Sequence, residues 1–124
     1  MQAAADVGRG SQVDILSVAG KVYVAYTDAS GYLCVLQVSA ENVQPIYRSQ
    51  TAIYPPRMEL LYEQDILWIS YAVGNTLELI NVWQPDDGSL PPLTVSGTYI
   101  SGTKHFFYDN KWYAVYCDYF AQGT

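Results

Sequence analysis

The chain has 124 residues, of which half are apolar and only 15% are charged. This composition indicates one folded domain and excludes a disordered segment or a coiled coil. Twelve acidic residues against six Lys and Arg give a net charge of −6. Because nucleic acids and anionic membranes attract Lys and Arg, this balance argues against both as partners.

No signal peptide is visible, and no apolar run reaches the roughly 20 residues that span a bilayer. We therefore expect no membrane insertion, and a cytoplasmic or virion-associated protein. Residues 1–12 mix Ala, Gly and polar side chains without a sustained period. They are predicted to form an N-terminal arm.

Beyond this arm, the chain is organised by a short stretch that occurs three times at a spacing of 45 residues. Each copy is rich in β-branched and aromatic residues and ends on Tyr, as is typical of β-strands. Self-similarity at a fixed spacing of this size is typical of repeat architectures. The three copies are residues 21–26, 66–71 and 111–116.

Each copy is preceded by another strand candidate and a break of two residues. Gly, Asp and Asn recur in the breaks, where a tight hairpin requires residues that tolerate φ > 0. We therefore predict three hairpins with the same connection and the same register. Their first strands are 13–18, 58–63 and 103–108, and their turns are Ala19-Gly20, Gln64-Asp65 and Asp109-Asn110.

The first two repeats continue with two more strands, whereas the third stops after its hairpin. The third strands are predicted at 33–38 and 77–82, and weaker, edge-like fourth strands at 45–53 and 92–100. The stretches 21–26 and 66–71 are apolar on both faces, which predicts sheets that are covered on both sides. The predicted units are 13–57, 58–102 and a partial unit, 103–124.

Four meandering strands in about 45 residues resemble a blade of the β-propeller superfamily, without the signature of one of its families. The resemblance implies an all-β fold of antiparallel, four-stranded, blade-like units that stack face to face, with about two and a half units. A β-sandwich is the alternative. Because a closed propeller takes about four to eight blades, an apolar face and a strand edge would stay open. Either the chain is a piece of a longer one, or copies of it or other partners complete the array, and we expect a homo-oligomer or a larger protein assembly.

Aromatic and polar residues near the predicted strand ends suggest a glycan-binding site. Aromatic faces stack on sugar rings, and amide and carboxylate groups supply hydrogen bonds; packing between units is the alternative role for these aromatics. The predicted ligand residues are Trp83, Tyr54, Tyr99, Asp86 and Asn75.

No catalytic site, metal site or cofactor is predicted. Asp14 and Glu59 occupy equivalent positions, as the carboxylate pair of a propeller glycosidase would, but Lys104 breaks the pattern in the third unit. His105 has no second histidine to share a metal, and 86–89 is typical of a turn rather than a Ca²⁺ loop. Cys34 and Cys117 are expected to be reduced, mostly buried thiols.

The sequence thus favours a non-enzymatic structural or interaction module, in a virion or another large assembly. A lectin-like glycan-binding propeller is the alternative. A fragment of a propeller glycoside hydrolase that uses Asp14 and Glu59 is a further one.

Overall fold

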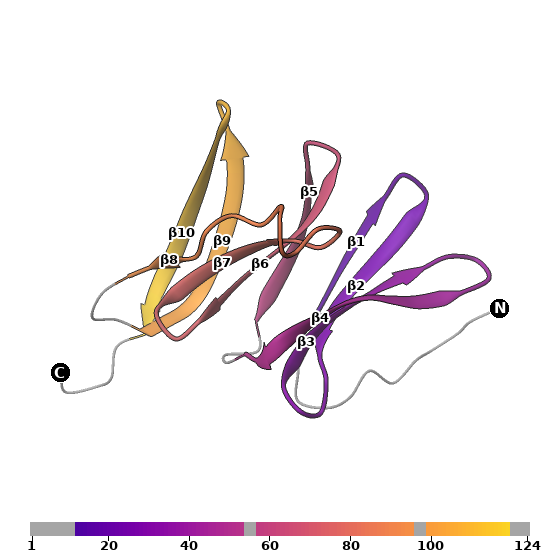
Figure 1. The fold of residues 1–124 in the computed structure, drawn as a ribbon, viewed down its shortest axis with the longest axis horizontal. Coiled ribbons are helices and arrows are strands. Elements are labelled where there is room, and N and C mark those ends of the chain that lie inside the picture. Colours follow the sequence, from indigo (N-terminus) through magenta and orange to yellow (C-terminus); the bar gives the residue numbers. More distant parts are fainter. Residues whose placement is uncertain (1–11, 54–56, 96–98, 120–124) are drawn as a thin grey trace.

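The computed structural model describes residues 12–53, 57–95 and 99–119 (Figure 1). These residues form an all-β fold of three antiparallel sheets with four, four and two strands, none of them closed. The all-β, antiparallel character expected from the sequence is confirmed. The first sheet contains β1 (Val13–Val18), β2 (Lys21–Thr27), β3 (Tyr32–Val38) and β4 (Val43–Ala52). The second contains β5 (Met58–Glu63), β6 (Ile66–Val73), β7 (Thr76–Asn81) and β8 (Leu93–Thr94), and the third contains β9 (Tyr99–Tyr108) and β10 (Lys111–Tyr119).

The three predicted hairpins are present with the predicted connections and register. The pairs that flank the turns are Val18 with Lys21, Glu63 with Ile66, and Tyr108 with Lys111. All six turn residues have φ between 51° and 79°. Positive φ at both central positions is the geometry of a type I′ turn, whose twist matches that of the flanking strands.

The fourth strand of the second repeat differs from the prediction. Residues 92–100 do not form one strand, because only β8 pairs with β7 and the chain from Tyr99 onward belongs to β9. Pro91 and Pro92 directly precede β8, and proline has no N–H to donate to a ladder. The equivalent strand of the first sheet, β4, has ten residues.

Neighbouring sheets pack through their faces. We call the face of each sheet that looks toward the preceding unit its backward face, and the other its forward face. On β6, Leu67 and Ile69 point backward to the first sheet, and Trp68 and Ser70 point forward to the third, with exposures of 0 to 4%. Both faces of β6 are therefore buried, as predicted, whereas only the forward-facing residues of β2 are buried.

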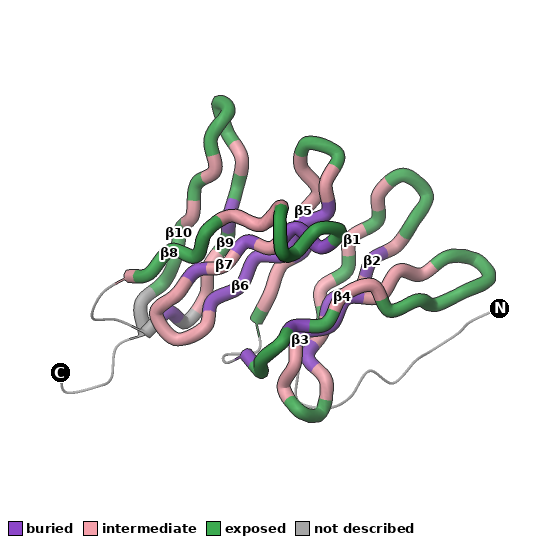
Figure 2. The backbone as a smooth tube through the Cα atoms, viewed as in Figure 1, coloured by how far each residue is buried: buried purple, intermediate pink, exposed green. Residues whose placement is uncertain are grey.

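The core lies mainly between the first and second sheets (Figure 2). Ten buried residues form this cluster, among them Leu33 and Val35 of the first sheet and Leu60 and Ile69 of the second. The cluster that reaches the third sheet has only three buried residues, Ala72, Leu77 and Ile100. The first interface thus lies between two four-stranded sheets, whereas the third sheet contributes only two strands to the second interface.

The predicted unit boundaries remain a prediction, since the strands alone do not define independent units. The predicted N-terminal arm lies almost entirely outside the described residues. Among the described residues, none forms a helix that is long and apolar enough to cross a bilayer.

Candidate functional site

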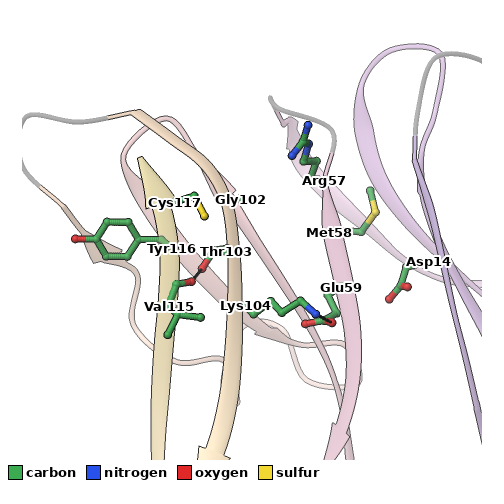
Figure 3. A pocket seen from close by; sticks show the side chains of 10 residues that line it. All are labelled: Asp14, Arg57, Met58, Glu59, Gly102, Thr103, Lys104, Val115, Tyr116 and Cys117. Carbon is green, nitrogen blue, oxygen red and sulfur yellow. Dashed lines mark hydrogen bonds and ion pairs between the residues drawn. The ribbon is translucent and has the colours of Figure 1, made fainter. Parts of the chain in front are cut away.

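The equivalent residues Asp14, Glu59 and Lys104 line one hollow of about 430 Å³ beside β1, β5 and β9 (Figure 3). Asp14 Oδ2 accepts a hydrogen bond of 2.7 Å from the backbone N–H of Leu60 on the next sheet. Lys104 Nζ lies 3.1 Å from Glu59 Oε2. Each carboxylate is therefore already engaged by another group of the chain, Asp14 by a backbone N–H and Glu59 by the Lys104 ammonium group. These contacts are those of a link between sheets.

Of the predicted glycan-binding residues that the structure describes, Trp83 and Asp86 lie in one loop and Asn75 lies apart from them. Trp83 is 45% exposed and packs edge-on against Tyr62, with ring centroids 6.0 Å apart, and Asp86 is exposed in the same loop. Asn75 lies at the opposite end of β7, a strand that spans roughly 20 Å. Tyr54 lies outside the described residues, as does the side chain of Tyr99. Trp83 and Asn75 therefore do not line one sugar site.

The segment 86–89 lies in a turn that is hydrogen-bonded to the residues before it. Gly88 N donates to Gln84 O at 2.8 Å, and Ser89 Oγ donates to Pro85 O at 2.8 Å. A Cβ atom on Gly88 would lie 2.5 Å from Asn81 Nδ2, so a larger residue here would displace the Asn81 side chain. Within the described ranges, no group of three or more His, Cys, Asp or Glu is arranged to hold a metal ion.

The two cysteines lie in different surroundings and are not joined by a disulfide. Cys34 is buried as expected, and burial together with the nearby Asp28 carboxylate raises the pKa of its thiol. Cys117 is exposed, so the expectation of a second buried thiol is wrong. It lies near the C-terminal end of β10, where the ladder shifts register.

His105 is a buried link between the second and third sheets. Its Nδ1 lies 2.7 Å from Ser70 Oγ, and burial lowers the pKa of the imidazole. Ser70 is 0% exposed, so its hydroxyl is not presented to a substrate at the surface. The pair thus satisfies two polar groups inside an interface.

Residues at the same position of the repeat differ sharply in exposure. On the second strand of each hairpin, Tyr23 and Trp68 are 3% and 4% exposed, but Tyr113 is 41% exposed. Two residues later, Ala25 and Ser70 are 0% exposed and Val115 is 53% exposed. The forward face of the third sheet is therefore exposed, although the equivalent faces of the first and second sheets are buried. We call it the C-terminal end face, with Phe106, Tyr108, Tyr113 and Val115 as its exposed apolar residues.

The backward face of the first sheet shows the converse pattern. Ile15 is 63% exposed, whereas Leu60 and His105, at the same repeat position, are 5% and 9% exposed. Val13 is 49% exposed on the same face. We call this surface the N-terminal end face. The two ends of the molecule therefore present the two faces that elsewhere pack against each other.

The third sheet also has an open strand edge. In the described part of the chain, β10 pairs only with β9, as expected from the missing strands of the third unit. A second hollow, of about 320 Å³, lies between this edge and the second sheet. Its apolar lining includes Leu79, Leu93, Trp112 and Ala114.

An uncovered face and an open edge were predicted from the sequence, but none of the residues that form them was predicted. The signal that identifies them is the repeat alignment, because Tyr113 and Val115 stand where buried residues stand in the first two repeats. Comparison with protein-family models, with curated proteins and with solved structures finds no match to this chain. The candidate site therefore depends on this geometry alone.

Proposed function

We propose that this protein is a non-enzymatic assembly module, built of β-propeller-type units, whose copies dock head to tail through their two end faces. The C-terminal end face of one copy packs on the N-terminal end face of the next. The observation that carries the proposal is the exposure of Val115 and Ile15 at repeat positions that are buried elsewhere in the chain.

The chain itself supplies the template for this contact. Between the first two sheets, the forward-facing Tyr23 and Ala25 share one core cluster with the backward-facing Leu60. A neighbouring copy would place its Ile15 at the position of Leu60, opposite Tyr113 and Val115. Apolar patches of this kind, presented on both ends of a repeat array, are typical of interaction surfaces.

The two end faces differ, so the contact is heterologous. A heterologous contact closes into a ring when the rotation between copies permits it, and otherwise extends as a filament. Two copies of the three sheets would bring six sheets, a number within the range of about four to eight blades in closed propellers. A two-copy ring is therefore the assembly that we favour.

Native mass spectrometry and light scattering at micromolar concentration test the proposal. We expect the unmodified protein to be a dimer or larger, and Ile15→Lys and Val115→Lys each to weaken association by at least about tenfold, because each buries an unpaired charge. An equal mixture of the two variants retains one intact contact and should form a 1:1 dimer. Association of two identical faces would give no such rescue.

Leu93→Lys is the control. Leu93 is an apolar residue with 55% exposure, close to the 53% of Val115, but it lies on β8 of the second sheet, which belongs to neither end face. This variant should leave the mass unchanged. A folded protein that stays monomeric up to about 100 μM, or variants that associate as well as the parent, would overturn the proposal.

A further inference from the structure

The open edge of β10 corresponds to a strand edge that is paired in the first two sheets. β2 and β6, its counterparts in the first two sheets, each have two neighbours: β2 lies between β1 and β3, and β6 between β5 and β7. β10 has the first neighbour, β9, and an open edge in place of the second within the described residues. Long, exposed and largely apolar edge strands are templates for the addition of a further strand.

The register of the β9–β10 hairpin identifies the groups on this edge. In a hairpin with a two-residue turn, the flanking pair, here Tyr108 and Lys111, is hydrogen-bonded, and bonded pairs then alternate along the ladder. The N–H and C=O groups of Tyr113 and Val115 therefore point to β9. Those of Trp112, Ala114 and Tyr116 point to the open edge.

The 320 Å³ hollow extends the second interface beyond β10. It is bordered by Leu77 and Leu79 of β7, by the segment 90–93, and by the edge of β10. Its lining includes no charged residue, and its histidine, His105, has a lowered pKa that favours the neutral form. In the first interface, the corresponding positions of β3, Leu33 and Val35, are 0% exposed and lie in the core cluster that the first two sheets share.

A second β10 strand does not fit this edge. Two β10 strands that pair antiparallel around a twofold axis keep the same faces of their sheets on the same side. Because β7 and β8 extend past β10 on that side, the second sheets of the two copies would occupy the same space. Self-pairing of the edge is therefore sterically disfavoured.

We propose that β10 and this hollow form a strand-acceptor site for an extended segment of a partner protein. The segment runs antiparallel to β10, carries apolar side chains at alternate positions, and is neutral or basic because this chain has a net charge of −6. Its backbone pairs with Trp112, Ala114 and Tyr116, and its apolar side chains enter the hollow, as in strand addition to other exposed sheet edges. This contact uses an edge, so it is independent of the docking of end faces.

The probe is a synthetic peptide of residues 31–39, which contain β3, with Cys34→Ala to prevent oxidation and two lysines at each end. β3 pairs with β2, the counterpart of β10, and Leu36 and Val38 lie on its backward side with Val24 and Val22. Amide hydrogen exchange by NMR is measured with up to about 1 mM peptide. The amides of Trp112, Ala114 and Tyr116 should exchange quickly without peptide and at least about tenfold more slowly with it. Those of Tyr113 and Val115 should be protected in both states.

Three variants sharpen the test. In the protein, Ala114→Pro removes one donor from the open edge and should weaken peptide binding by about tenfold, whereas Ala114→Ser keeps the donor and should not. Leu93→Lys places a charge at the hollow and should weaken binding without a change to the backbone. A peptide with Leu36→Asp should bind at least about tenfold more weakly than its parent.

The Ile15→Lys protein separates this site from the proposed self-association, since it should bind the peptide normally while its end-face contact is weakened. Unchanged exchange at Trp112, Ala114 and Tyr116, or equal protection by the Leu36→Asp peptide, would overturn the strand-acceptor site. Either result would leave the end-face proposal standing.

Discussion

The two interfaces between sheets use equivalent positions of the same repeat in different ways. In the first interface, Leu60 and Ala25 lie in a cluster of ten buried residues. In the second, the corresponding positions hold His105 and Ser70, joined by a hydrogen bond of 2.7 Å. Apolar area contributes roughly in proportion to what is buried, whereas a hydrogen bond contributes little net stability. We infer that the first two sheets form the stable part of the molecule and that the third is held weakly.

The largest expected effect comes from the same substitution at both interfaces. Ile69→Ala, in the first interface, should lower the free energy of unfolding by about 4 kcal/mol, and Ile100→Ala, in the second, by about 2 kcal/mol. Ile69 and Ile100 are 0% and 1% exposed, but Ile100 belongs to a small cluster that can relax around the cavity. Urea unfolding measures both values, and equal losses would contradict the difference between the interfaces.

A smaller and local effect is expected from Trp112→Ala. The Trp112 ring lies 5.1 Å from Trp68 and 5.2 Å from Phe107, so its removal should loosen the third sheet by about 2 kcal/mol. Amide exchange in β9 should speed up while that of Leu67 and Ile69 stays slow. Tyr113→Ala is the control, because Tyr113 stacks only on Phe106 of its own sheet among the described ring pairs. Simultaneous loss of protection in all three sheets would argue against a separately held third sheet.

The polar contacts between sheets should also contribute more to stability at the first interface than at the second. Asp14→Ala leaves the N–H of Leu60 without its 2.7 Å acceptor and should cost about 1.5 kcal/mol. Glu59→Ala breaks an ion pair in which the Lys104 side chain is 69% exposed, and it should cost less than about 0.5 kcal/mol. Thermal unfolding of the two variants gives the comparison. A larger loss for Glu59→Ala would mean that the ion pair is more than a surface contact.

The smallest effect, one of pH, should have opposite signs at the two interfaces. Burial lowers the pKa of His105 from 6.5, so its contribution is complete above pH 6.5 and is lost as the pH falls through the folded-state pKa. Burial raises the pKa of Glu78, which faces the first sheet, from 4.5. Its contribution is complete below pH 4.5 and is lost as the pH rises through the folded-state pKa.

Between pH 7 and 5, amide protection should therefore fall in β9 and rise in β7. His105→Gln should remove the change in β9 and leave that in β7. A fall of equal size in both strands would contradict the assignment of these groups.

The fold was predictable from the sequence as far as hairpin geometry determines it. Two-residue turns fix the register, so the pairs at Val18, Glu63 and Tyr108 followed directly from the spacing. The length of the fourth strands could not be predicted from the alignment of 92–100 with 45–53. This alignment takes no account of the backbone N–H donors that are missing at Pro91 and Pro92. The prediction of a strand at 92–100 also did not include the competing pairing of Tyr99 with Tyr119 of β10.

The candidate site was less predictable, for a different reason. Tyr23, Trp68 and Tyr113 are all aromatic, so the residue types do not reveal which one lacks a neighbouring sheet. Burial depends on what lies opposite a strand, and that depends on the order of the sheets. The glycan-binding hypothesis was based on closeness to strand ends. It did not distinguish the two ends of β7, and Asn75 and Trp83 lie at opposite ends of this strand.

Packing between sheets joins units that follow each other along the chain, as in the bond from Asp14 to Leu60, 46 residues away. Each sheet therefore needs only its predecessor in order to dock. During synthesis, which proceeds from the N-terminus, the first two sheets are complete before β9 emerges. We expect the newly made chain to mature in steps, with the third hairpin added last onto a surface that is already formed.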